Sequence, residues 1–135
     1  MPGGDGFAPA FDALERTLHD IELVARRSDA ERKRDLIVQR RLLAERMTAV
    51  QQLAHAPGSP FAREPEALEF HRQFSKMRSA VALHQATWSV VLIDDAPQEY
   101  LDSSRSASDA VRAFLLWARG VLRALQPGGA LRGGA

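Results

Sequence analysis

The sequence EALEFHRQFSKMRSAVALHQATWSVVLI, which runs from Glu66 to Ile93, decides the fold of this chain. Its apolar residues recur in alternating steps of three and four, which places them on one stripe of an α-helix. The stripe, with one polar member, comprises Ala67, Phe70, Phe74, Met77, Val81, His84, Trp88 and Val91. No charged residue lies between Ser79 and Ile93, so we expect neighbours to cover this half of the helix on more than one side. The pattern predicts the central helix of a small soluble bundle.

The end of this stretch has a second interpretation. Residues 90–95, VVLIDD, resemble a buried strand that ends in paired acids, as in response-regulator receiver domains. A receiver domain needs further strand–helix units, and only about forty residues follow. The run also continues the helical stripe in phase, which favours the helix. A membrane span is not predicted, because the uncharged part is shorter than roughly 20 apolar residues and contains polar side chains.

Composition places the chain among ordinary globular proteins. It has 135 residues, of which 45% are apolar and 26% charged, as expected for a single domain. A formal net charge of +1 gives no strong field that would draw the whole molecule to nucleic acid or membrane. The lack of cysteine excludes disulfides and thiolate chemistry. The residues after Met1 have neither the basic nor the apolar segment of a secretory signal, so we expect a cytoplasmic protein.

The N-terminal half predicts two helices. Glycines at the start mark residues 1–9 as a flexible leader, and a helix is predicted over 10–26. The pattern then lapses, because a continuous helix would place Ser28 and Arg32 on its buried seam. Ser28 and Glu31 instead fit a capping box, whose side chains bind free N–H groups at the start of a new helix. We therefore predict a break at Ser28, and one continuous helix is the alternative.

The second helix, predicted over 29–54, carries two apolar stripes. The first is assigned to the core and comprises Leu36, Leu43, Met47, Val50 and Ala54. The second is displaced around the helix and comprises Val38, Leu42, Ala49 and Leu53. Because one stripe satisfies the core contact, the other needs the first helix or another molecule to cover it.

Turn residues delimit the remaining helices. Residues 57–60, PGSP, form the clearest loop, and Asp95 is predicted to cap a last helix. The run Ser103–Asp109 is rich in serine, a poor helix former, so the last helix is expected to be either continuous or divided into two pieces. The fold class is therefore all-α: a small bundle of three to four mostly antiparallel helices over 10–126, followed by a flexible tail, 127–135.

No residue pattern predicts catalysis, a cofactor or a metal. The four histidines do not form the Glu-x-x-His pairs with which di-iron bundles bind metal. Neither His71 nor His84 has the lysine and glycine spacing of phosphotransfer modules, and the sequence has no glycine-rich phosphate loop. His84 lies on the apolar stripe, so we predict a buried, neutral core histidine that is hydrogen-bonded to a neighbouring helix. The chain is not expected to be an enzyme.

By exclusion, and because of the second stripe, we expect a protein-interaction module: an adaptor, an assembly or export chaperone, or a regulatory partner. The predicted binding face, for a protein partner or a second copy, comprises Val38, Leu42, Ala49 and Leu53, with Arg41 and Glu45 on its polar rim. In outline such a bundle resembles small bacterial flagellar export chaperones, which are helical chains of this length. The alternative is a nucleic-acid-binding regulator that uses the basic stretch Arg26 to Arg46, with phosphate contacts from Arg32, Lys33, Arg34, Arg40 and Arg41.

Overall fold

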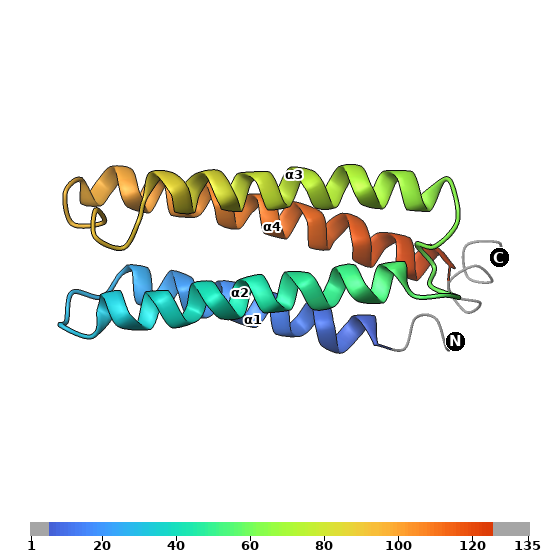
Figure 1. Ribbon diagram of the computed structural model, residues 1–135, viewed down its shortest axis with the longest axis horizontal. Coiled ribbons are helices and arrows are strands. Elements are labelled where there is room, and N and C mark those ends of the chain that lie inside the picture. The colour runs from blue at the N-terminus through green and yellow to red at the C-terminus, as the bar shows by residue number, and fades with distance from the viewer. Residues whose placement is uncertain (1–5, 126–135) are drawn as a thin grey trace.

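The computed structural model describes residues 6–125, which form four helices joined by loops. In chain order they are α1 (Phe7–Ala25), α2 (Arg32–His55), α3 (Glu66–Thr87) and α4 (Pro97–Leu125). Consecutive helices run in opposite directions, and the loops between them lie at alternate ends of the molecule (Figure 1). The prediction of a small all-α bundle with antiparallel helices is confirmed.

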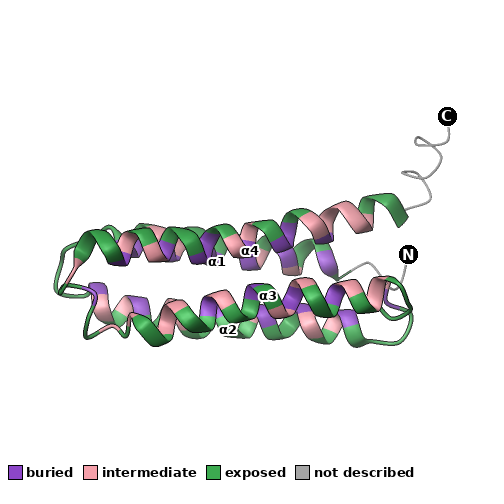
Figure 2. Ribbon diagram, turned by 90° about the horizontal axis from the view of Figure 1, so that it is seen from above, coloured by how far each residue is buried: buried purple, intermediate pink, exposed green. Residues whose placement is uncertain are grey.

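The helices do not all pack against one another equally closely. α1 packs along α2, α3 packs along α4, and α1 also contacts α4. α2 and α3 approach each other less closely, although they are consecutive in the chain. Figure 1 shows these two close pairs side by side, and Figure 2 shows the bundle from above, with α1 and α4 on one side and α2 and α3 on the other. Of the adjacent helix pairs, α2 and α3 are therefore the most loosely joined.

An aromatic cluster fills the end of the bundle where α1 begins and α4 ends. Phe70 on α3 lies at its centre, with its ring centroid 5.2 Å from Phe61, 5.4 Å from Phe74 and 5.7 Å from Phe114. Phe61 comes from the loop between α2 and α3 and is buried, so this loop contributes a side chain to the core. Rings at these separations, several of them edge to face, add to the stabilisation from area burial.

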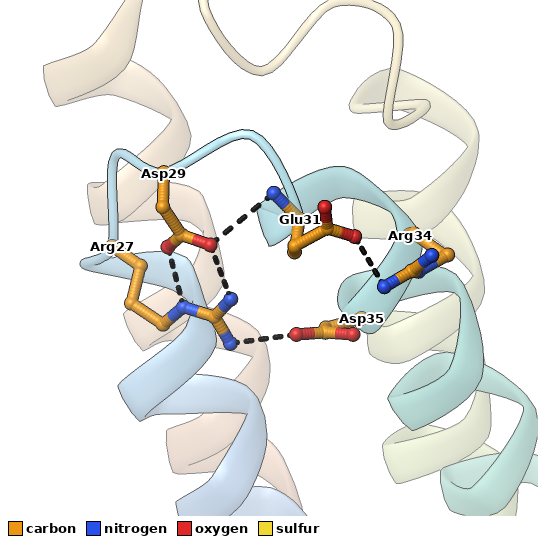
Figure 3. A network of polar contacts seen from close by, with 5 residues as sticks. All are labelled: Arg27, Asp29, Glu31, Arg34 and Asp35. Carbon is orange, nitrogen blue, oxygen red and sulfur yellow. Dashed lines mark hydrogen bonds and ion pairs between the residues drawn. The ribbon is translucent and has the colours of Figure 1, made fainter.

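The predicted break near Ser28 is confirmed, but the predicted capping box is wrong. α2 begins at Arg32, and no side chain caps its first turn. Asp29 organises the turn instead: its carboxylate accepts a hydrogen bond from the backbone N–H of Glu31 and two from the Arg27 guanidinium, at 2.6 and 2.7 Å (Figure 3). Arg27 also pairs with Asp35 at 2.8 Å. An Asp carboxylate is a stronger acceptor than a Ser hydroxyl, and Arg27 fixes its position.

The central helix is shorter than the predicted span of 66–93. α3 ends at Thr87, and the chain then passes through turns, in which the N–H of Leu92 donates to the carbonyl of Ser89. Because the helical phase is lost there, Val91 is 72% exposed and Ile93 is buried in its place. The expectation that neighbours cover this half on more than one side is also wrong, since Leu83 is 69% exposed. The β-branched residues of VVLI favour helix only weakly, which suits an early end.

The other boundaries differ from the predictions by a few residues. α1 begins at Phe7, a fully buried residue within the segment 1–9 that the glycines marked as a leader. α4 is continuous through the serine-rich run, and it begins at Pro97, where the N–H of Tyr100 donates to the carbonyl of Ala96. Ala96, not Asp95, therefore directly precedes the helix. The predicted tail, 127–135, lies outside the described residues.

Ion pairs on the surface connect α1 with α4. Arg112 donates to both carboxylate oxygens of Glu22, at 2.6 and 2.8 Å, and this hydrogen bonding lowers the pKa of Glu22. Arg119 pairs with Asp12 at 2.9 Å and with Glu15 at 3.0 Å. Exposed pairs of this kind contribute roughly 0–1 kcal/mol each, so they set the orientation of the two helices more than the stability of the bundle.

Candidate functional site

A groove runs between α2 and α3, the loosely joined pair. Its volume is about 240 Å³. Buried side chains form its floor, namely Met47 from α2 with Phe74 and Val81 from α3. The remaining lining residues are small or polar: Ala44, Thr48, Gln51, Arg78, Ala82 and Gln85. An apolar floor with polar groups on its sides is the usual composition of a binding site.

Arg78 is the only charged residue that lines the groove. Its guanidinium carbon lies 5.7 Å from the centroid of the Phe74 ring, a cation–π geometry that holds the side chain over the floor. Among residues 6–125 it has no ion-pair partner at salt-bridge distance. The groove therefore has a positive charge at its side and no acidic residue in its lining.

The face predicted from the second stripe of α2 is divided in the structure. Val38 is 46% exposed and Ala49 is also exposed, whereas Leu42 and Leu53 are half-buried. Leu53 packs against the core, and a Cβ at Gly6 would lie only 3.0 Å from its Cδ2 atom, so the start of α1 covers it. Less apolar surface of this stripe is therefore available to a partner than the sequence pattern indicated.

The two polar members of the predicted face, Arg41 and Glu45, are both exposed. Glu45 follows Ala44 directly, and Arg41 lies one helical turn earlier on α2. Arg41 therefore neighbours the groove-lining Ala44, whereas Glu45, as the next residue after Ala44, points about 100° away around the helix. The structure brings Arg41 next to the groove lining and places Leu53 elsewhere, against α1.

Four of the five cations proposed to contact phosphates have partners within the chain. Arg32 is buried and bonds Asp94 at 2.7 Å, and Lys33 bonds the second oxygen of the same carboxylate at 3.1 Å. Arg34 pairs with Glu31, which directly precedes α2, as Figure 3 shows. Arg40 donates to the backbone carbonyl of Trp88 at 2.7 Å, and so caps the C-terminal end of α3. Arg41 alone of the five is exposed without such a contact among the described residues.

His84 contacts α4 as predicted, although it is half-buried instead of buried. Its Nδ1 atom lies 2.7 Å from the hydroxyl of Ser103 on α4, and its ring stacks on Tyr100 with centroids 5.8 Å apart. Burial and the nearby Arg40 cation lower the pKa of His84 from 6.5 to about 4. The imidazole is therefore neutral near pH 7, in agreement with the prediction.

The His84–Ser103 contact resembles one part of a hydrolytic triad, in which a neutral histidine accepts a proton from a serine. The rest of such a site is missing from this neighbourhood. The charged group that lowers the pKa of His84 is the Arg40 guanidinium. A triad has a carboxylate in this place, which stabilises the protonated imidazole. The adjacent cavity has a volume of about 20 Å³, which is too small for an organic substrate. Within residues 6–125 there is also no cluster of three or more metal-ligating side chains.

We expect the neutral His84 to make stability depend on pH. Below pH 6.5 the unfolded chain binds a proton that folded His84 does not bind until about pH 4, so stability falls as the pH is lowered through this window. After allowance for its partial exposure, the loss between pH 7 and pH 5 should be about 1–2 kcal/mol. Urea unfolding at the two pH values measures it.

The matched variants are His84→Gln and His71→Gln, because His71 is exposed. His84→Gln should abolish most of the pH dependence, and His71→Gln should keep it. Glu22 and Asp94, whose pKa values are lowered by their Arg and Lys partners, remain ionised throughout this window. An unchanged pH dependence in His84→Gln would show that another group is responsible.

The groove itself was not predicted. Phe74, Met47 and Val81 were assigned to the core by their periodicity, and the structure confirms that they are buried. Whether a core residue also forms the floor of a groove depends on how closely the neighbouring helix approaches. The small Ala44 and Ala82 are the one sequence signal, since neither fills the space between α2 and α3.

Comparisons with known proteins identify no family model, no curated protein and no solved structure that matches this chain. None of the helices in the described part of the chain combines the length and the apolar character that crossing a membrane requires.

Proposed function

We propose that this protein is an interaction module that binds one α-helix of a partner protein in the groove between α2 and α3. The observation that supports this is the groove itself: about 240 Å³ with an apolar floor, between the two adjacent helices that pack least closely. A third helix laid along two others is a recurrent mode of recognition, in which apolar anchors one turn apart enter the groove.

The small residues on both sides favour a helix as the occupant. Ala44 and Ala82 have short side chains, so the backbone of a partner helix can approach α2 and α3 closely. Its apolar stripe would then contact Met47, Phe74 and Val81. Burial of each Leu or Val of the partner contributes about 1.5–3 kcal/mol before the costs of association.

The charges around the groove favour a partner helix with acidic residues beside its apolar stripe. Arg78 lines the groove without an ion-pair partner among residues 6–125, and Arg41 lies beside it on the α2 side. Glu45 is the one acidic neighbour on that stretch of α2. Carboxylates at the flanks of the partner would meet Arg78 and Arg41 and would set the direction in which the helix docks. A nucleic acid is not proposed, because four of the five cations that would contact phosphates, namely Arg32, Lys33, Arg34 and Arg40, have intramolecular partners.

The proposal is tested by selecting binders from a displayed library of amphipathic helices with fixed apolar positions and random flanking positions. Selection is made on the wild-type chain and on the variant Ala82→Gln, which places a longer neutral side chain in the groove. The control is Ala113→Gln, the same change at an exposed position on α4. Circular dichroism verifies that all three proteins are folded.

We expect helices that bind the wild type and Ala113→Gln at least tenfold more tightly than Ala82→Gln, with Asp and Glu enriched at the flanks. Binders that do not distinguish Ala82→Gln from the wild type would refute the groove as the site. Binders that depend on the groove but have basic or neutral flanks would refute only the acidic partner. Self-association of the chain that Ala82→Gln disrupts would identify a second copy as the occupant instead.

A further inference from the structure

The side chain of Tyr100 has an unusual position, since it is fully buried and its hydroxyl makes no hydrogen bond of standard geometry to the described residues, although the Arg40 side chain lies nearby and lowers the pKa of the hydroxyl against the effect of burial. Beside it lies a cavity of about 20 Å³ in the middle of the bundle. Its polar lining comes from three helices: Arg40 on α2, His84 and Gln85 on α3, and Ser104 and Ser108 on α4. We propose that this cavity is a binding site for one ordered water molecule, which is hydrogen-bonded to the Tyr100 hydroxyl.

The size of the cavity is sufficient for a water molecule. A cavity needs roughly 10–15 Å³ of volume occupied by a water-sized sphere before it can hold one. The cavity beside Tyr100, at about 20 Å³, meets this requirement. Buried waters in proteins typically make about three hydrogen bonds, and the cavity offers more polar groups than that.

The chemistry of the lining also fits water. Ser104 and Ser108 can each donate or accept a hydrogen bond, as can the Tyr100 hydroxyl. No carboxylate lines the cavity, and Arg40 already uses one Nη atom to cap Trp88. A water molecule that accepts from one of these groups and donates to another would satisfy Tyr100, whose burial otherwise carries the full cost of desolvation.

This site gives a reason for the serines of α4. Ser104 and Ser108 are four residues apart, so they lie on one face of the helix, and both are buried. Serine is a poor helix former, and apolar residues at these positions would pack better against a dry core. The hydroxyls of serines at these positions supply donors and acceptors for the water molecule that satisfies Tyr100.

The test is a pair of double-mutant cycles that combine Tyr100→Phe with Ser104→Ala and with Ser108→Ala. Phenylalanine has nearly the shape of tyrosine, so Tyr100→Phe should remain folded. If water satisfies the hydroxyl, Tyr100→Phe should raise the unfolding equilibrium constant about fivefold. For at least one double variant, the fold-increase in the unfolding equilibrium constant should then be smaller than the product of the fold-increases of its two single variants.

The opposite sign overturns the proposal. An unsatisfied buried hydroxyl costs stability, so its removal by Tyr100→Phe would leave the unfolding equilibrium constant unchanged or lower it. Additive effects in both cycles would likewise exclude a shared water molecule. A high-resolution crystal structure gives the direct readout, with one spherical density peak expected within hydrogen-bond distance of the Tyr100 hydroxyl. Replacement of that peak by anomalous bromide density in a bromide-soaked crystal would show that the site binds an anion.

Discussion

Replacing Phe70 with alanine is expected to lower the free energy of unfolding by about 3–5 kcal/mol. Phe70 is 2% exposed, and its ring contacts come from three other segments of the chain, the first of which is α2 with His55. Phe61 lies in the loop between α2 and α3, and Phe114 and Trp117 lie on α4. Removal of the ring therefore leaves a cavity at the point where these segments meet, and the surrounding rings are too rigid to fill it.

The loss should be visible in urea unfolding as a lower midpoint with an unchanged slope. The matched control is Leu68→Ala on the same helix, because Leu68 is apolar but 61% exposed. That variant should change stability by no more than about 0.5 kcal/mol. A loss below about 1 kcal/mol for Phe70→Ala would mean that the aromatic cluster repacks around the gap, contrary to the rigid packing described above.

The buried face of the first part of α3 could be predicted from periodicity alone. Phe70, Phe74, Met77 and Val81 are all buried, as their spacing requires. Periodicity failed near Trp88 because it carries no information on where a helix ends. The carbonyl of Trp88 accepts a hydrogen bond from Arg40, a residue 48 positions earlier in the chain. A contact at that distance in sequence cannot be read from the local pattern.

The candidate binding site was predictable only in part for a related reason. The second stripe of α2 correctly indicated surplus apolar residues, but their coverage depends on the neighbouring helices. Leu53 is covered by the start of α1, which extends three residues further than predicted. The groove arises where α3 does not approach α2 closely, and only the three-dimensional packing determines that separation.

The basic residues illustrate the same limit. In a continuous helix Arg32 would lie on the buried seam, and this predicts the helix break that the structure has. The sequence also makes Arg32 a possible phosphate contact, but in the structure its guanidinium binds the Ala25 carbonyl and the Asp94 carboxylate. Composition identifies a cation, but the positions of Ala25 and Asp94 determine whether its charge is available to a ligand.

Replacing Arg32 with alanine is expected to cost about 2–4 kcal/mol of folding stability. Its guanidinium donates to the buried carbonyl of Ala25 at 2.8 Å and to the carboxylate of Asp94 at 2.7 Å. It therefore connects the end of α1, the start of α2 and the loop between α3 and α4. The guanidinium carbon also lies 5.7 Å from the centroid of the buried Tyr100 ring. Alanine removes all of these contacts and leaves the Ala25 carbonyl without its partner.

The control is Arg34→Ala, since Arg34 is exposed and, among the described residues, pairs only with Glu31, which directly precedes α2. That change should stay within about 0.5 kcal/mol, the usual range for an exposed pair. Arg32→Met separates packing from polar contacts: it retains most of the side-chain volume and eliminates the buried Nε atom, which has no hydrogen-bond partner among the described residues. If Arg32→Met is as stable as the wild type, the hydrogen bonds to Ala25 and Asp94 contribute little and the side chain acts through packing. If it is nearly as unstable as Arg32→Ala, these two bonds are what join the three segments, because the lost packing is small and the buried carbonyl of Ala25 remains unpaired.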